Sequence, residues 1–435
     1  MSNHPFRPLR HRTVRLLWGA AVVSDIGTWV QLIVVGSLVA ADTGSAVKTG
    51  LVALATFTPQ GLASPVGGLL ADRYDRRRVF ACALMLQAVM TTTLAVVLGT
   101  GVRNPYALTV IILFASAAGA LGAPSYAAMQ PDLVPADELM SMVSLGVYSW
   151  NSGRIVGPLL GTALVATVGP SWTIAFNAVT FLGLAIAVSS LRRSYLPAHD
   201  DDGSVAERLT EGWNAVRRTP GCWHAVVLLV LLNLTMVPFM GLIPIFAAAE
   251  FDGGTGLAGV ISSAQGVGAI IGGIVLTVVA ARRRRSDILV GTIMLISISL
   301  TAYAVAPTTT LVAMAAAVLG SGGAAIFIMS SSLLQRDAPP HSRGRVMAMM
   351  HASLGVSYGI GIMIIGSIGD AVGLRIAFVS GAGALALGFW ALTMRSSMWR
   401  AAIDGPAAQA VGSGAGGSGA GVDVAGVDVE PEFAH

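Results

Sequence analysis

The chain of 435 residues is 54% hydrophobic and only 11% charged, and its mean hydropathy is +0.74. Soluble domains carry about 25% charged residues, so this composition excludes an ordinary soluble protein and predicts an all-α integral membrane protein. The formal net charge is +4, but the arginines lie in short runs between apolar stretches. That distribution argues against a nucleic-acid-binding surface.

Only Cys82 and Cys222 are present, both in or beside apolar runs, so no disulfide framework is expected. The histidines and cysteines are too scattered for a metal site. The chain also lacks the G-x-x-x-x-G-K-[ST] run that cradles nucleotide phosphates. We therefore expect no metal, no cofactor and no enzymatic activity.

Polar breaks divide the chain into twelve apolar stretches, each long enough for the roughly 20 residues that cross a bilayer. After a polar arm (1–13), six helices are predicted, at 14–41, 47–71, 79–100, 106–128, 139–168 and 171–191. The second six are predicted at 222–249, 256–281, 287–306, 309–333, 346–372 and 374–395. These sets predict two six-helix bundles, 14–191 and 222–395, joined by a charged connector at 192–220. The tail at 401–435 is rich in glycine and alanine and is expected to be disordered.

Positive charge lies almost entirely at one end of the predicted helices. Of the 26 lysines and arginines, 22 fall in the arm, the connector, the C-terminal segment and the loops on the same side. Loops rich in these residues stay in the cytoplasm. Both termini are therefore predicted to be cytoplasmic, in a multi-pass protein of the plasma (inner) membrane.

The two halves share residues at a constant spacing of 205 positions. The matched pairs are Trp18 and Trp223, Gln60 and Gln265, Gly61 and Gly266, Gly67 and Gly272, Gly68 and Gly273, and Asp132 and Asp337. Identities at a single register indicate an internal duplication. Asp72 has Thr277 at its repeat position, so any role of that aspartate belongs to the first half alone.

A dense charge cluster forms the turn between the second and third predicted helices, where residues 67–78 read GGLLADRYDRRR. Glycines let the end of a helix approach a neighbour closely, and arginines anchor at lipid headgroups. The turn is therefore expected to be short and to lie at the water-facing edge of the membrane. A plain positive anchor is the alternative.

This turn resembles the loop between helices 2 and 3 of the major facilitator superfamily, whose pattern is close to G-x-x-x-D-R-x-G-R-R-R. The matching residues are Gly68, Asp72, Arg73, Arg76, Arg77 and Arg78, and Asp75 stands where many members have glycine. The D-R-x-D-R-R-R form is similar to the branch that includes the enterobactin exporter and related secretion effectors. The resemblance covers about residues 6 to 400 and implies two six-helix bundles around a central substrate path.

A conformational switch at this turn is a further expectation. Asp132 ends a predicted helix near the same face and would pair with Arg73 or Arg76, closing the inner side in one state. Static anchoring is the alternative.

Charged residues are costly inside a membrane and mark functional sites. Asp25 and Arg154 lie within predicted spans, and Val230 and Gly359 stand at their repeat positions. We expect Asp25 and Arg154 to meet, or to face the central cavity together, with Asp25 carrying the proton that drives transport. The alternative is a static ion pair between two helices.

Glycines recur every four residues in the fifth predicted helix, at Gly153, Gly157 and Gly161, and Pro158 bends its middle. The run resembles the G-x-x-x-G-P-x-x-G-G motif of superfamily exporters, which implies export and a place where the two halves slide. Thr162 replaces the last glycine. A small-residue packing face is the alternative. The helix-4 arginine of drug antiporters has no counterpart in the stretch 115–119.

Polar and aromatic side chains within the spans are the candidates for the cavity wall. They are Trp29, Gln31, Gln60, Tyr148, Trp150, Asn151, Asn177, Asn233, Gln265, His351 and Tyr358. Helix-to-helix hydrogen bonding is the alternative role for each of them.

These patterns predict a monomeric secondary active transporter that exports an amphipathic small molecule, such as a drug, siderophore or secondary metabolite, in exchange for protons. The expected partners are that substrate, protons and the lipid bilayer, with no nucleic acid. The alternatives are an importer or facilitator of a small nutrient, and a membrane sensor or scaffold that transports nothing.

Overall fold

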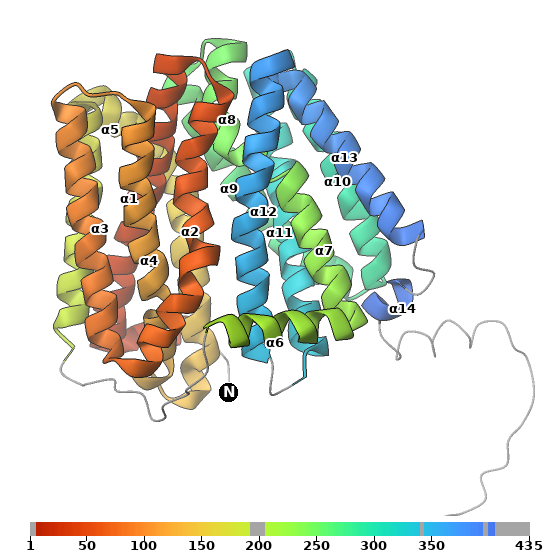
Figure 1. The fold of residues 1–435 in the computed structure, drawn as a ribbon, viewed down its shortest axis with the longest axis horizontal. Helices are drawn as coiled ribbons and strands as arrows, with labels where there is room; N and C mark the ends of the chain where they lie inside the picture. Colours follow the sequence, from red (N-terminus) through yellow and green to blue (C-terminus); the bar gives the residue numbers. More distant parts are fainter. Residues whose placement is uncertain (1–5, 192–204, 340–342, 395–398, 405–435) are drawn as a thin grey trace, which may run out of the picture.

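The structure is a computed structural model that describes residues 6–191, 205–339, 343–394 and 399–404. This part of the chain folds into helices alone, arranged as two bundles side by side (Figure 1). The first bundle contains η1 (Arg7–Arg10), α1 (Arg12–Thr43), α2 (Ala46–Arg73), α3 (Arg76–Gly99), α4 (Pro105–Leu133), η2 (Ala136–Glu138) and α5 (Leu139–Ser189). The second contains α7 (Pro220–Thr235), α8 (Pro238–Phe251), α9 (Gly254–Ala280), α10 (Arg285–Val305), α11 (Thr309–Asp337), α12 (Arg343–Val372) and α13 (Leu374–Met394).

The described helices confirm the predicted set of membrane spans. Ten segments are long and apolar enough to cross a bilayer. One of them contains α5, which is interrupted at Gly169, where φ is 80° and ψ is 169°. Because only glycine adopts such a φ readily, this break divides α5 into the two predicted helices. That extra helix, together with α2, which is not among the ten but whose 28 residues lie beside the others, accounts for the twelve predicted helices within the described residues.

One predicted helix, 222–249, is divided where a single helix was expected. Its first part, α7, ends at Thr235, and α8 begins at Pro238. Proline has no backbone N–H and is well suited to the first turn of a helix, so Pro238 ends one segment and starts the next. Together α7 and α8 form one span.

The repeated glycines perform the same task in both bundles. A Cβ atom added at Gly67 of α2 would lie 2.4 Å from the carbonyl oxygen of Leu121 in α4. At Gly272 of α9, it would lie 2.4 Å from the carbonyl oxygen of Ser321 in α11. The second and fourth helices of each bundle therefore touch backbone to backbone. Between the bundles, α2 packs along α12 and α5 packs along α9.

Part of the predicted connector is helical. Helix α6 (Val205–Arg218) lies across one end of the second bundle, against α12 and α7 (Figure 1). Its Glu211 pairs with Arg345, and the rings of Trp213 and Trp223 meet edge to face at 5.8 Å. We name this end of the molecule, where the arginine-rich turns and α6 lie, the arginine-rich end. Residues 192–204 of the connector lie outside the described residues.

The tail begins later than predicted, because α14 (Trp399–Asp404) docks at the arginine-rich end (Figure 1). The Asp404 carboxylate accepts hydrogen bonds from the Ser286 backbone N–H at 2.9 Å and from its hydroxyl at 2.8 Å. Arg336 donates to the carbonyl of Ile403 at 3.1 Å. These contacts order residues 401–404, and 405–435 lie outside the described part.

Candidate functional site

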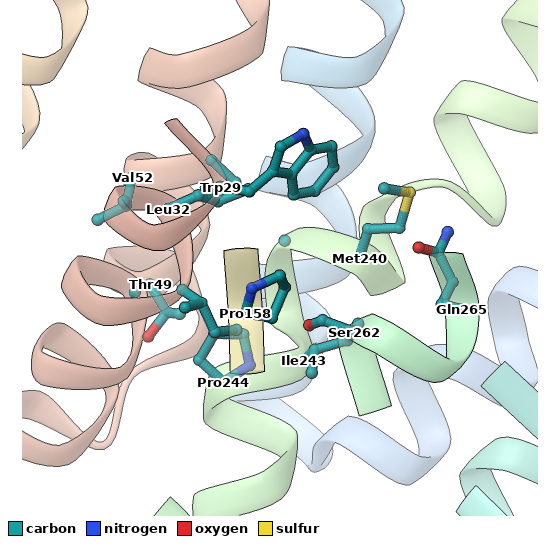
Figure 2. Close-up of a pocket in the computed structure, with 14 residues that line it drawn as sticks. Trp29, Leu32, Thr49, Val52, Pro158, Met240, Ile243, Pro244, Ser262 and Gln265 are labelled. Atoms are coloured by element: carbon teal, nitrogen blue, oxygen red, sulfur yellow. The ribbon is translucent and has the colours of Figure 1, made fainter. Parts of the chain in front are cut away.

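A small pocket lies between the two bundles, lined by side chains from both (Figure 2). The first bundle contributes residues of α1, α2 and α5, among them Trp29, Val52 and Pro158, and the second contributes residues of α8 and α9, among them Met240, Pro244 and Gln265. Its cavity volume of about 20 Å³ holds roughly one water molecule. A drug-sized molecule would enter this pocket only after the bundles separate.

Four aromatic rings connect the bundles beside the pocket, and we name Trp29, Phe57, Trp150 and Tyr358 the aromatic cluster. The ring of Trp29 meets that of Trp150 edge-on, with centroids 5.5 Å apart. It meets the ring of Phe57 at a tilt, with centroids 6.1 Å apart. Phe57 of the first bundle meets Tyr358 of the second edge-on at 5.5 Å. Trp29 Nε1 and the Tyr358 hydroxyl are buried and have no hydrogen-bond partner among the described residues. Such an unpaired buried group costs about 1–3 kcal/mol, so both can bond to a polar ligand at little further desolvation cost.

Asp25 lies one helical turn before Trp29, on the same side of α1. Its carboxylate accepts a hydrogen bond from the hydroxyl of Ser149, a buried residue of α5. Sequence reasoning did not identify Ser149, because a serine within an apolar span gives no distinctive signal.

Arg154 has its partner in the other bundle. Its Nε donates to the side-chain oxygen of Gln265 in α9 at 2.9 Å, and Gln265 lines the pocket. Within the described part of the chain, no ion pair joins Asp25 to Arg154. The two predicted proton-coupling residues thus lie near the pocket with separate partners.

The glycines of the fifth predicted helix pack against α1 in the same bundle, and not at the interface between the bundles as the exporter motif implied. A Cβ at Gly157 would lie 2.5 Å from Cβ of Trp29, one at Gly153 2.8 Å from the backbone of Asp25, and one at Gly161 3.1 Å from Ile33. This close packing is what holds Asp25 and Trp29 against α5.

Other atoms of α5 form the contact with the second bundle. The Thr162 hydroxyl donates to the carbonyl of Thr255 at 3.1 Å, and Ser263 donates to the carbonyl of Ile155 at 2.6 Å. Pro158, between these two contacts, lines the pocket. The contact of α5 with the second bundle therefore runs through Ile155, Pro158 and Thr162.

The turn between α2 and α3 is held by backbone contacts. Asp75 caps α3, because its carboxylate accepts from the N–H groups of Arg77 at 2.9 Å and Arg78 at 3.2 Å. Arg76 donates to the carbonyls of Ala71 at 3.3 Å and Ala128 at 3.2 Å, and Arg77 donates to that of Leu191. Asp75, which departs from the superfamily pattern, therefore has a specific N-capping role.

The remaining residues of the predicted switch are placed as follows. A Cβ at Gly68 would meet no heavy atom within 4 Å, whereas one at its neighbour Gly67 would clash with the backbone of α4. Arg73 is exposed. Among the described residues, no ion pair joins Asp132 to Arg73 or Arg76, so that latch stays a prediction.

Several predicted cavity residues have partners on their own helix or bundle. Gln31 accepts from Asn177 at 2.8 Å, within the first bundle. Asn151 and Asn233 donate to the carbonyls one turn earlier, those of Val147 at 2.9 Å and Leu229 at 2.8 Å. Tyr148 lies beside Phe6, and Tyr148, Gln60 and His351 are exposed.

At the end opposite the arginine-rich end, Asp370 of α12 joins the two bundles. Its carboxylate accepts from the Ser45 hydroxyl at 2.6 Å and from the backbone N–H groups of Ala46 at 2.5 Å and Val47 at 3.2 Å. An acidic side chain of the second bundle thus caps the N-terminus of α2 in the first, where the helix dipole favours negative charge. Sequence reasoning missed Asp370; its one signal was an acidic residue near the end of a predicted span.

Among the described residues, no group of three or more histidine, cysteine, aspartate or glutamate side chains is placed to hold a metal ion. The polar groups near the pocket are instead one carboxylate, one guanidinium, amides and hydroxyls, set among aromatic and aliphatic side chains. Such a site can bind an amphipathic molecule, including one that carries a positive charge.

Several known proteins with similar sequences are efflux proteins. Macrolide efflux protein A of Streptococcus pyogenes is 23% identical over 368 residues, which is 82% of this chain and 90% of that protein. The multidrug efflux pump Tap of Mycolicibacterium fortuitum is 26% identical over 374 residues, covering 84% and 91%. Tap of Mycobacterium tuberculosis is 27% identical over 379 residues, covering 84% and 89%.

Solved transporters share the fold. A variant of the nucleoside transporter NupG superposes with a TM-score of 0.71 at 13% identity, over 88% of this chain and 99% of that one. A bacterial homolog of the human lysosomal transporter Spinster, in an inward-facing unoccupied conformation, gives 0.68 at 14% identity, over 91% and 97%. The model of the transmembrane secretion effector family matches residues 3–407. The chain belongs to that family, within the major facilitator superfamily.

Proposed function

We propose that this chain exports an amphipathic, positively charged small molecule from the cytoplasm and takes up protons in return. The observation that carries the proposal is the arrangement on α1. Asp25, a carboxylate in the membrane interior, lies one turn from Trp29, which lines a pocket shared by both bundles and whose indole N–H has no hydrogen-bond partner among the described residues. The efflux proteins among the relatives support export and an amphipathic cargo such as a macrolide or another drug.

A negative charge in the membrane interior is costly. Either a proton or a cationic cargo would neutralise the Asp25 carboxylate, but not both together. Cargo bound on the aromatic cluster would displace the proton, and a proton would release the cargo. Ser149 holds the carboxylate toward α5. Competition of this kind links the two flows without direct contact between proton and cargo.

Movement of the bundles would expose the site to each side in turn. In the described conformation, Asp370 joins the bundles at one end of the molecule, and the pocket between them has a volume of only about 20 Å³. We propose that the arginine-rich end lies in the cytoplasm, since basic loops remain there, and that Asp370 lies at the outer face. Release of Asp370 from α2 would then open the exit path.

Transport in proteoliposomes tests the proposal. The purified chain should dissipate an imposed pH gradient when a macrolide or a lipophilic cation is added. The Asp25→Asn variant should lose the gradient dissipation and the uphill movement of cargo, because asparagine carries no proton. Asp42→Asn is the matched control, since Asp42 pairs with Arg103 within the first bundle, at 3.4 Å and away from the pocket.

Full proton-coupled transport by Asp25→Asn would show that the proton is carried elsewhere. The wild-type protein should also be tested with a siderophore. If it moved none of the three, the macrolide, the cation or the siderophore, the result would count against export of amphipathic molecules altogether.

A further inference from the structure

A second, larger cavity lies within the second bundle, away from the central pocket. Its volume is about 360 Å³, and its wall consists of residues from α9, α10 and α11 together with Arg283 of the turn between α9 and α10. It shares no lining residue with the central pocket. The main contacts of α10 are with α11, α13 and α14, so this crevice belongs to the outer side of the second bundle.

Four of the residues that line the crevice are small, namely Gly272, Gly291, Ser321 and Gly322. A Cβ at Gly291 would meet no heavy atom within 4 Å. In the first bundle, Phe80 of α3 and Tyr126 of α4 stack at 5.1 Å and join the third and fourth helices. The third and fourth helices of the second bundle instead leave a space beside α9.

The crevice opens toward hydrocarbon. Val275 and Leu295 line it and are 51% and 44% exposed. In a helix that spans a bilayer, exposed apolar side chains on the outer side of a bundle face lipid. A lipid tail can therefore enter the crevice sideways from the membrane.

The end of the crevice nearest the arginine-rich end is strongly basic. Arg282, Arg283 and Arg284 lie in the turn between α9 and α10, and Arg285 is the first residue of α10. Arg283 lines the crevice, and none of the four forms an ion pair with another described residue. Nη1 of Arg285 is buried and has no hydrogen-bond partner in the described part of the chain. One acidic residue, Asp287, also lines the crevice. Its carboxylate oxygen lies 3.8 Å from Nη1 of Arg400, so the positive charge of Arg400 offsets the negative charge of Asp287.

From this geometry we infer that the crevice binds an anionic phospholipid, with its phosphate among Arg282 to Arg285 and one acyl chain between α9, α10 and α11. Basic pockets between helices attract the anionic headgroups of the cytoplasmic leaflet, and guanidinium groups match phosphate oxygens in geometry. The inference rests on insertion in the membrane and on the charge of the crevice, and is independent of transport.

Lipid retention by the detergent-purified full chain tests the inference. Native mass spectrometry with phosphatidylglycerol and phosphatidylcholine at equal concentrations should show preferential retention of phosphatidylglycerol. The Arg282→Gln/Arg283→Gln variant should bind it on the order of tenfold more weakly. The matched control is Arg217→Gln/Arg218→Gln, which removes two exposed charges from α6 at the same end of the molecule.

A variant that fills the crevice provides an independent test. Gly291→Phe should displace the acyl chain and lower phosphatidylglycerol retention, without a clash at Cβ. Gly183→Phe in the first bundle, where a Cβ also meets nothing within 4 Å, should leave retention unchanged. Equal retention of the two lipids, or unchanged retention in Gly291→Phe, would overturn the inference. If Gly291→Phe displaced the transported cargo and left phosphatidylglycerol retention unchanged, the crevice would be a site for cargo and not for lipid.

Discussion

At the scale of single residues, Asp370 joins the bundles by three hydrogen bonds. It places one carboxylate on the hydroxyl and two N–H groups at the start of α2. Loss of an N-cap costs about 1 kcal/mol, which is roughly a fivefold change in an equilibrium constant. Asp370→Ala should therefore shift the population about fivefold toward conformations that are open at this end.

Labelling of a pocket residue measures that shift. In a Cys82→Ser/Cys222→Ser background, Thr49→Cys places a thiol in the pocket on α2. A membrane-impermeant maleimide should label it several times faster when Asp370→Ala is added. Asp42→Ala, which removes another acidic residue from the same end, should not change the rate. Equal rates in the two variants would mean that Asp370 does not hold this end closed.

Asp25 and Arg154 show which parts of the candidate site can be predicted from the sequence. An ionisable residue in an apolar stretch is visible from composition alone, and both do lie near the central pocket. Their partners, Ser149 and Gln265, depend on how the helices are rotated and staggered against one another. That packing follows from glycine contacts such as the one between Gly157 and Trp29, which a helical periodicity does not specify.

At the scale of elements, the contact of α1 with α5 depends on the absence of a side chain at Gly157. A Cβ there would lie 2.5 Å from Cβ of Trp29 and 2.9 Å from the carbonyl oxygen of Ile26. Overpacking of this kind costs about 1–3 kcal/mol. Gly157→Val should therefore lower the thermal unfolding temperature in detergent and reduce transport by displacing Trp29.

The control lies on the same helix. A Cβ at Gly146 of α5 would meet nothing within 4 Å, so Gly146→Val should unfold near the wild-type temperature. If both variants unfolded at that temperature, the glycine face would have no packing role.

Helices formed by long, uniformly apolar stretches were predictable from the sequence. Elements that depend on a single residue or on a tertiary contact were not. Long apolar stretches bounded by charges gave the spanning helices, and Gly169 marked the break in α5. The division between α7 and α8 depends on a proline inside a continuous apolar run. Helix α6 lies in a charged connector, where its stability depends on contacts with α12 such as the pair of Glu211 and Arg345.

At the scale of the whole molecule, the two bundles are expected to move as rigid bodies about the central pocket. Covalent links distinguish this model from local rearrangement. A Cβ at Gly369 of α12 would lie 3.3 Å from Cβ of Ala46 in α2, close to the 3.5–4.5 Å that a disulfide requires. In the cysteine-free background, oxidation of Gly369→Cys/Ala46→Cys should abolish transport, and a reductant should restore it.

A second pair, placed inside one bundle, is the control. A Cβ at Gly99 of α3 would lie 3.8 Å from Cβ of Ser171 in α5, at the same end of the molecule. Because both helices belong to the first bundle, a disulfide in Gly99→Cys/Ser171→Cys should leave transport intact. Inhibition by both links would indicate that the first bundle itself deforms, and inhibition by neither would exclude separation of α2 from α12 as a step in transport. Inhibition by the link between bundles alone would establish that the contact made by Asp370 must open in every cycle.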